Sequence, residues 1–320
     1  MCINQRTIVN RRYVKAAGSS SRAEVLFRDA PDLYFLVDCG RCLPCLKKRS
    51  NYWRQRLIDE FTYYIKKDSS RKYKVYFVTL TIAPEYYKRD LNYVGTLIKK
   101  FRERYRKRFG CSLRFWMISE YGEKRGRLHL HAIFFNPLFE ATQLKDLWQY
   151  GRVDMSVVGC SLRNPEQDPV KGIAYVTKYL TKNVDKWFIK YEDRSRIWCS
   201  PGIGKAYCLD PRNRESHLHH HVPLFFRVDD SGKFPQALPR YYIDKLFSPL
   251  DILKRARTSV QRLHQPLQFP ITVCNHRFDS FAPYLQFVQS VGGRVTLLST
   301  QFNKMSPDHI KLYLTQFTYE

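Results

Sequence analysis

Residues 71–160 alternate between short apolar runs and segments with a helical period, and this order restricts the folds that the chain can form. The apolar runs are rich in β-branched and aromatic residues, which favour strands. The expected elements are strands at 73–82, 113–121, 128–135 and 152–158 and helices at 91–108 and 140–151. The order β-α-β-β-α-β predicts an α+β fold with a ferredoxin-like, mainly antiparallel sheet backed by helices.

Two further helices flank this region. Leu46, Trp53, Leu57 and Phe61 recur at helical spacing in a basic amphipathic segment that follows a cysteine cluster. A second helix is expected at 169–184, beginning with Pro in its first turn. We therefore divide the chain into a cysteine-cluster and helix tract (1–70), a core (71–184) and a mixed C-terminal region (185–320) to which the sequence assigns no role.

The charge balance of the chain points to a polyanionic partner. Lys and Arg number 55 against 29 acidic residues, a formal net charge of +26, and 22 Tyr, 21 Phe and 5 Trp are interleaved with them. Such a charge opposes compaction unless a polyanion neutralises it, so nucleic acid is the first candidate partner. The segment 99–108, "KKFRERYRKR", is either a solvated face or a contact with backbone phosphates, and the net charge favours the phosphates.

The sequence gives no sign of membrane insertion or of export. No apolar run approaches about 18 residues, and no signal peptide is recognisable. Nine cysteines, three of them clustered, do not suggest a disulfide framework and fit a reducing compartment. We expect no membrane partner and a cytoplasmic location.

Two histidines two residues apart interrupt the strand "LHLHAIFF". His129 and His131 share one face of an extended strand, about 7 Å apart along the chain. If the turn of the hairpin is centred on residues 124 and 125, Glu120 lies opposite His129 and Ile118 opposite His131. One carboxylate and two imidazoles then converge on one face and could hold a divalent cation. Two histidines on a solvated face are the alternative.

A second histidine cluster is less suggestive. His217, His219, His220 and His221 follow the turn-rich stretch "DPRNRE" and have no apolar strand pattern before them. We expect a loop there and no metal site.

The helix at 169–184 carries a polar face that could support nucleophilic chemistry. Tyr175, Lys178, Tyr179 and Lys182 are spaced i, i+3, i+4 and i+7, opposite a face formed by Ile173 and its apolar neighbours. A tyrosine can attack a phosphodiester where a metal and nearby lysines neutralise the phosphate and stabilise the leaving oxygen. On this helix alone, a half-buried or DNA-contacting aromatic face explains the pattern equally.

The run "CGRCLPC" places Cys39, Cys42 and Cys45 close enough to share an ion. Zinc usually takes four ligands, and Cys2 is the candidate for the fourth. Free thiols in a turn, or a redox pair, are the alternatives.

Taken together, these segments resemble a known family. "FVTLTI" (77–82), "SEYGEKRGRLHLHAIFF" (119–135) and "YVTKYLTK" (175–182) are similar, in this order, to the three motifs of the HUH rolling-circle endonucleases. More narrowly, the chain resembles the replication-initiation proteins of microviruses (gokushovirus-like), small phages with circular single-stranded DNA. Further similar segments are "MCINQ", "CGRCLPC" with "WRQRL", "SPGIG" (200–204) and "LPRYY" (238–242), so the resemblance covers roughly residues 1–245.

The resemblance implies a role for each candidate residue. His129 and His131 correspond to metal ligands with Glu120 as the best third, and Tyr175 and Tyr179 match a two-tyrosine active site. It implies a metal-dependent endonuclease that nicks a phage origin through a 5′-phosphotyrosine and rejoins the ends. Mn²⁺ or Mg²⁺ suits a His₂-carboxylate site. The implied partners are single-stranded and nicked origin DNA, a host helicase and a host polymerase, in the bacterial cytoplasm.

Other functions fit parts of the pattern. A plasmid-type initiator or a transposase of the same superfamily would use the same chemistry. A non-catalytic, zinc-containing DNA-binding protein would use the basic faces and the cysteines, but would need no metal beside a tyrosine.

Overall fold

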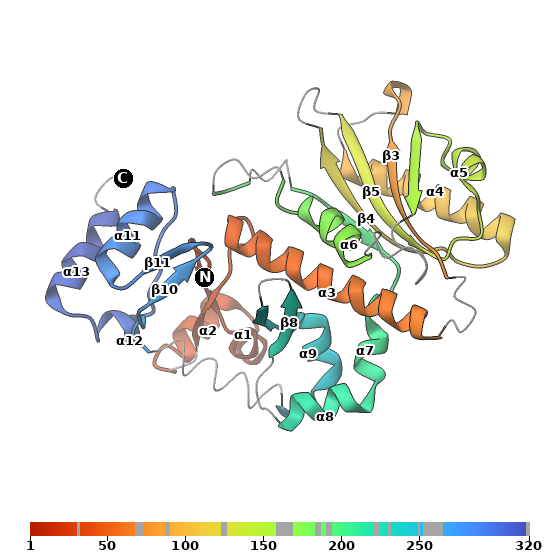
Figure 1. Cartoon of the computed structure of the whole chain (residues 1–320). Coiled ribbons are helices and arrows are strands. Elements are labelled where there is room, and N and C mark those ends of the chain that lie inside the picture. The colour runs from red at the N-terminus through yellow and green to blue at the C-terminus, as the bar shows by residue number, and fades with distance from the viewer. Residues whose placement is uncertain are drawn as a thin grey trace. The chain divides into compact units, whose positions relative to one another are not determined.

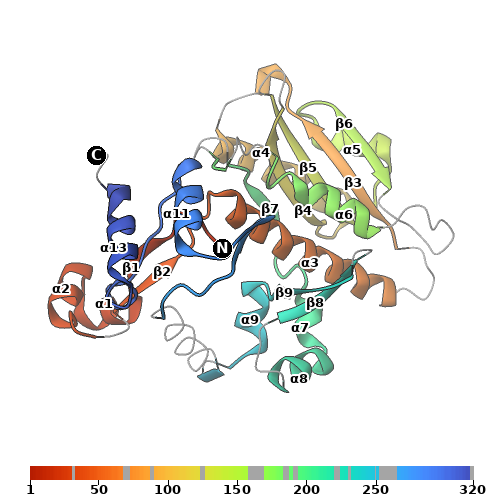
Figure 2. The same cartoon turned by 60° about the vertical axis from the view of Figure 1, so that its left-hand side comes forward.

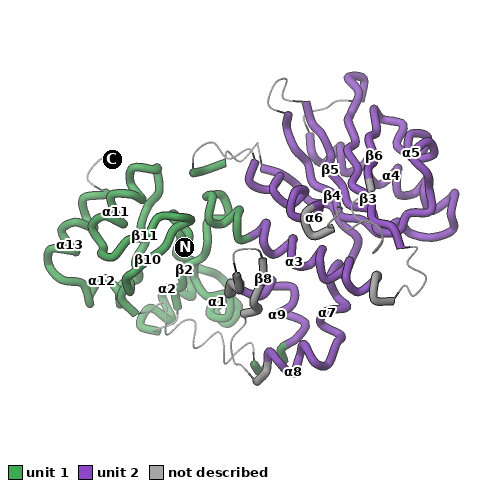
Figure 3. Tube along the Cα trace, viewed as in Figure 1, with its two compact units in different colours: residues 1–48, 184–189, 247–320 green, residues 49–183, 190–246 purple. Residues whose placement is uncertain are grey.

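The computed structural model describes residues 1–30, 33–67, 73–86, 90–122, 127–157, 169–182, 187–189, 194–219, 224–229, 232–248, 250–251 and 265–317. The chain forms two compact units (Figure 3). The first contains residues 1–48, 184–189 and 247–320, and the second contains residues 49–183 and 190–246. The division into three functional tracts at 70 and 184 stays a prediction.

An antiparallel five-stranded sheet is the framework of the second unit (Figure 1). Its strands lie in the order β6-β3-β5-β4-β7, and every neighbouring pair is antiparallel. The bounds are β3 Val75–Thr81, β4 Arg114–Tyr121, β5 Leu128–Phe135, β6 Val153–Val157 and β7 Ile197–Cys199. The first four strands in the sequence occupy the sheet in the order fourth, first, third, second, as in a ferredoxin-like fold. The α+β class and the β-α-β-β-α-β order are therefore confirmed, and β7 adds an edge strand.

Helices cover both faces of this sheet (Figures 1 and 2). On one face, α4 (Leu91–Phe109) and α5 (Ala141–Trp148) pack on the side chains of Val78, Leu80, Met117 and their neighbours. On the other face, α3 (Leu43–Lys67) and α6 (Pro169–Lys178) contribute Leu57, Phe61, Ile173 and Val176 to a second core with Trp116, Ile118 and Ile133. Side chains alternate between the two faces along each strand, and Glu120, His129 and His131 belong to the α6 face.

Two helix ends differ from the sequence-based expectation. Helix α6 ends at Lys178, and the chain continues in a turn through Lys182 with i→i+3 bonds such as Thr181 N to Lys178 O, 2.8 Å. The expected end near 184 falls where residues 183–186 lie outside the described part of the chain. Helix α5 ends at Trp148 with a left-handed cap at Gln149. Gly151, expected to end it, instead approaches Thr81 with a φ of 158°, where a Cβ would collide with the Thr81 carbonyl.

The second unit also contains shorter elements. They are the 3₁₀ turn Pro84–Tyr86, α7 Lys205–Leu209, α8 Pro211–His219, β8 Leu224–Asp229, β9 Gly232–Ala237 and α9 Arg240–Leu246. The expectation of a loop at the second histidine cluster is wrong for His217 and His219, which lie in α8. A proline at the start of α8 suits a first helical turn, so a turn-like composition there begins a helix. His220 and His221 lie outside the described residues.

The first unit combines N-terminal and C-terminal elements. The N-terminal ones are β1 Arg6–Val9, α1 Arg11–Ala17, α2 Ser20–Leu26 and β2 Tyr34–Val37. The C-terminal ones are β10 Ile271–Val273, β11 His276–Phe278, α11 Phe281–Ser290, α12 Ser299–Phe302, α13 Pro307–Leu314 and the 3₁₀ turn Thr315–Phe317. Its core joins Ile3 and Cys42 to Val273, Leu285 and Val288. Among the helices in the described residues, none has the length and apolar character needed to cross a membrane.

Candidate active site and cysteine cluster

The β4–β5 hairpin has the register that the sequence predicts. Glu120 pairs with His129 and Ile118 with His131. The turn itself, at 123–126, lies outside the described residues. The carboxylate and both imidazoles project from one face of two neighbouring central strands, because their positions share the same parity. The sheet, rather than a loop, therefore fixes the positions of these three side chains.

His131 is enclosed by four partners. The ring is 7% exposed. Its Nε2 lies 2.5 Å from Glu120 Oε2, and its Nδ1 lies 3.2 Å from the hydroxyl of Thr79, the residue opposite it on β3. Tyr179 stacks on the imidazole with a centroid separation of 3.8 Å and an interplanar angle of 5°. Phe77 stacks more distantly, at 5.8 Å. This packing leaves the ring one orientation.

Glu120 is a buried carboxylate held by two cationic or polar partners. It is 3% exposed, and its second oxygen lies 2.6 Å from Lys182 Nζ. Burial raises the pKa of Glu120, but the bonds from His131 and Lys182 outweigh burial and bring the pKa below its ordinary value. Glu120 is therefore ionised at neutral pH and can act as an anionic ligand or hydrogen-bond acceptor.

His129 completes the group two residues before His131 on β5. Its ring is half-buried, 6.4 Å from the His131 ring between centroids. Burial, and then the neighbouring His131, lower the pKa of His129 below its ordinary 6.5. A neutral imidazole offers a nitrogen lone pair, which is the form that binds a metal.

The donor set suits a divalent cation, although its atoms are engaged with one another. Two imidazoles and one carboxylate match the ligands of Mn²⁺ and related metals. The hydroxyl of Thr79 can donate to Nδ1 of His131 or accept from it, so the ring stays oriented whether or not its Nε2 carries a proton. A cation at Nε2 would take the place of the direct contact between His131 and Glu120 and weaken the Lys182–Glu120 ion pair. The residues fit the metal without rearrangement of the sheet.

The two tyrosines differ more than the sequence predicts. The expectation that both phenols lie opposite the apolar face of the helix is wrong for Tyr179, which is 7% exposed and packs in the same core as Ile173 and Val176. The reason is that α6 ends at Lys178, and the following turn brings Tyr179 onto His131. Tyr175 remains 53% exposed. The two hydroxyls nevertheless meet, with Tyr179 donating to Tyr175 at 3.0 Å.

Hydrogen bonds and packing fix the end of α6. Ser50 on α3 donates its hydroxyl to the Thr177 carbonyl at 2.8 Å, and Ser195 donates to the Tyr179 carbonyl at 3.3 Å. Ile173 is fully buried beneath the helix. Anchors on both sides of the tyrosine pair hold it over the sheet.

The two lysines of this segment have different surroundings. Lys182 pairs with Glu120, and its ammonium lies 5.4 Å from the centre of the Tyr179 ring. Lys178 is exposed. Of the two, only Lys182 lies against the carboxylate and the stacked ring, and Lys178 is placed to meet an incoming anion.

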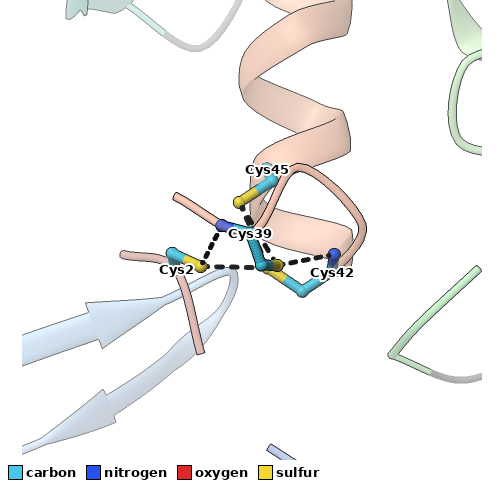
Figure 4. Close-up of side chains that lie close together, drawn as sticks. All are labelled: Cys2, Cys39, Cys42 and Cys45. Carbon is cyan, nitrogen blue, oxygen red and sulfur yellow. Dashed lines mark hydrogen bonds between the residues drawn. The ribbon is translucent and has the colours of Figure 1, made fainter. Parts of the chain in front are cut away.

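The four cysteines predicted to share an ion come together in the first unit (Figure 4). Cys2, Cys39, Cys42 and Cys45 are all buried, and their sulfur atoms lie within 4.8 Å of one another. Three of the separations are 3.3, 3.7 and 4.0 Å. Tetrahedral zinc with bonds of about 2.3 Å requires sulfur–sulfur separations of about 3.8 Å. This cluster can therefore bind a metal such as zinc.

Backbone amides support the same interpretation. The amides of Arg41 and Cys42 point to the Cys39 sulfur at 3.4 and 3.3 Å, and the amide of Cys39 points to Cys2 at 3.3 Å. Contacts with Cys2 first, then Cys42 and Cys45, lower the pKa of the Cys39 thiol. Amide donors directed at sulfur stabilise thiolates, the form that binds metal. Among the described residues, no other group brings three or more such ligand atoms so close together.

The basic helix α4 lies on the opposite face of the sheet from the histidines. Phe101 and Tyr105 are buried, and Arg104 is occupied by the carbonyls of Leu147 and Trp148. Lys100, Arg102, Arg106, Lys107 and Arg108 are exposed. A phosphate contact by this face stays a prediction, and any such contact lies away from the face that carries His131.

Sequence reasoning missed two residues of the site. Thr79 orients His131, and Phe77 touches both His131 and Tyr175, the latter edge-on at 5.9 Å. A signal for Thr79 was present: Thr79 and Thr81 lie two apart in an apolar strand, as His129 and His131 do. Polar residues at matching parity in adjacent strands indicate one shared face.

Comparison with known proteins agrees with this geometry. Residues 75–184 match the model of a family of replication-associated proteins, the ORF2 type. This segment includes β3, β4, β5 and α6, and thus every residue of the candidate active site from Phe77 to Lys182. Searches of curated proteins and of solved structures give no match. The core of the second unit therefore resembles replication-associated proteins, a class that acts on DNA.

Proposed function

We propose that this protein is a replication-initiation endonuclease that nicks single-stranded DNA through a 5′-phosphotyrosine and later rejoins the ends. One observation carries the proposal: two hydrogen-bonded tyrosines sit directly on His131, beside a His₂-carboxylate donor set. A binding protein has no need for a phenol stacked on a buried histidine. The family match covers the same residues.

The proposed roles follow from position and charge. His129, His131 and Glu120 would hold Mn²⁺ or Mg²⁺, which polarises the scissile phosphate. Lys182 and Lys178 would neutralise phosphate charge, Lys182 from beside Glu120 and Lys178 from the exposed side of the helix. Thr79 keeps His131 oriented. These groups surround the tyrosine hydroxyls, where a phosphodiester would bind.

The reaction exchanges one phosphate ester for another. The phenol oxygen of a tyrosine forms a bond to phosphorus, and the bond from phosphorus to the 3′-oxygen breaks. The phenol loses its proton, and the departing 3′-oxygen gains one, so the net proton count is unchanged. The product is a 5′-phosphotyrosine and a free 3′-hydroxyl. Attack of a 3′-hydroxyl on the phosphotyrosine reverses the exchange and rejoins DNA.

We further propose that the substrate is the origin of a circular single-stranded phage genome. The 3′-hydroxyl would prime a host polymerase, and a host helicase would open the duplex, in the cytoplasm of the bacterial cell. The net charge of +26 supports a nucleic-acid partner. Zinc bound by the four cysteines would stabilise the first unit without taking part in the chemistry.

Formation of a covalent adduct tests this function. The full chain is incubated with a pool of single-stranded oligonucleotides, with Mn²⁺ or with chelator. We expect a denaturation-resistant protein–DNA adduct only with Mn²⁺, and a phosphotyrosine in the peptide that contains 175 and 179. An adduct on serine or histidine, or cleavage with no protein link, would refute the mechanism. A non-catalytic DNA-binding protein would bind the pool and form no adduct.

A further inference from the structure

The two tyrosines are placed so differently that they cannot have equal access to DNA. Tyr175 is 53% exposed, whereas Tyr179 is 7% exposed beneath it. Tyr179 lies flat on His131, and Tyr175 stands edge-on to both Tyr179 and Phe77, at 5.5 and 5.9 Å between centroids. A phosphodiester arriving from solvent therefore meets the Tyr175 oxygen first.

The hydrogen bond between the phenols gives the pair a direction. Tyr179 donates to Tyr175 at 3.0 Å. Burial, and then this bond to Tyr175, raise the pKa of Tyr179, so Tyr179 keeps its proton. A donated hydrogen bond leaves the remaining lone pair of Tyr175 free and stabilises negative charge on the Tyr175 oxygen as its own proton leaves.

We infer that Tyr175 is the tyrosine that forms the first covalent link to DNA, and that Tyr179 acts first as its hydrogen-bond donor. This inference rests on the proposed function. In the first step, Tyr175 Oη bonds to phosphorus and the 3′-oxygen leaves, taking up a proton from solvent in exchange for the one that the phenol releases. Tyr179 is a positioning residue in this step, because it acts through the Tyr175 oxygen.

The same arrangement assigns Tyr179 its part in rejoining. Once Tyr175 carries DNA, the Tyr179 hydroxyl lies beside the ester oxygen that must leave. When a 3′-hydroxyl attacks that phosphate, the bond from phosphorus to Tyr175 breaks, and Tyr179 can donate a proton to the departing phenolate. The Tyr179 oxygen, then deprotonated and next to the metal ligands, is available to cut a second junction.

The test is a rapid-quench comparison of single variants of the full chain with the oligonucleotide pool and Mn²⁺. Tyr175→Phe and Tyr179→Phe each remove one hydroxyl and keep the ring, so the stacking on His131 remains. We expect the wild-type adduct at the shortest times on Tyr175. Tyr175→Phe should lower the first-turnover adduct at least about 1,000-fold, and Tyr179→Phe about fivefold, the effect of one neutral hydrogen bond. Tyr86→Phe, an exposed tyrosine outside α6, is the matched control.

A pH profile separates positioning from mere support of the fold. Without the bond from Tyr179, negative charge on the Tyr175 oxygen is less stabilised, so the single-turnover rate of Tyr179→Phe should rise at higher pH than that of the wild type. Loss of packing alone would lower the rate equally at every pH. A first adduct on Tyr179, or loss in Tyr179→Phe as complete as in Tyr175→Phe, would overturn the assignment while leaving the tyrosine mechanism intact. Absence of an adduct on both would overturn the proposed function as well.

Discussion

The cysteine cluster of the first unit and the histidine site of the second unit present ligand atoms in opposite states. The four sulfur atoms lie within 4.8 Å of one another, and their printed partners are the other sulfurs and backbone amides. At the sheet, the ligand atoms of His131 and Glu120 bond to each other, to Thr79 and to Lys182. The cluster is complete by itself, and the sheet site is held by protein groups that a substrate or cation could replace.

This contrast separates a site that stabilises a fold from a site that performs chemistry. A tetrahedral arrangement of four buried sulfurs leaves no open position for a substrate. Two imidazoles and one carboxylate leave several positions open, and a half-exposed lysine and an exposed tyrosine stand beside them. We therefore expect removal of a ligand to reduce stability in the first unit and catalysis in the second.

The largest effect should follow from removing a sheet ligand. His131→Ala takes away an imidazole that contacts Glu120 and stacks under Tyr179. We expect DNA nicking to fall by about 1,000-fold or more, because the phosphate loses its metal. DNA binding should change little, because Lys and Arg contacts with phosphates provide most of the affinity. Gel-based nicking and fluorescence-anisotropy binding assays measure the two effects.

His309→Ala is a matched control for this variant, because His309 is an exposed histidine on α13 of the first unit. It should nick as the wild type does. If a variant lacking both His129 and His131 nicks normally with Mn²⁺, the metal lies elsewhere.

A large effect of the other kind is expected at the cysteines. Cys42 is fully buried, and its sulfur contacts those of Cys2 and Cys45. Cys42→Ser should lose about one zinc per chain and lower the free energy of unfolding of the first unit by roughly 3 kcal/mol or more, because zinc binding is coupled to folding. Elemental analysis and thermal unfolding measure these changes.

Cys111→Ser tests whether the effect belongs to the cluster. Cys111 is an exposed thiol after α4, outside the cluster. It should keep both zinc content and stability. Wild-type protein that contains no zinc and is equally stable in chelator would show that the four cysteines are only thiols, and the contrast between the two regions would then fail.

The sequence predicts the frame of both regions better than it predicts their detail. The hairpin register follows from two strands of clear pattern around a polar turn, and Glu120 faces His129 as that register requires. The burial of Tyr179 could not be predicted, because it depends on the helix ending at Lys178 and on a hydrogen bond from Ser195, distant along the chain. Strand β7 has only three residues, too few to show a period of two.

The smallest expected effect tests whether the sheet site depends on groups that orient its ligands. Thr79→Val removes the hydroxyl 3.2 Å from His131 Nδ1 and keeps a β-branched side chain suited to a strand. The ring loses its only partner on that side among the described residues, so the concentration of Mn²⁺ that supports half-maximal nicking should rise about 10-fold, with little change at saturation. Thr96→Val, on the exposed surface of α4, should leave the Mn²⁺ titration unchanged. Equal titrations for Thr79→Val and the wild type would mean that packing between Tyr179 and Phe77 alone orients His131.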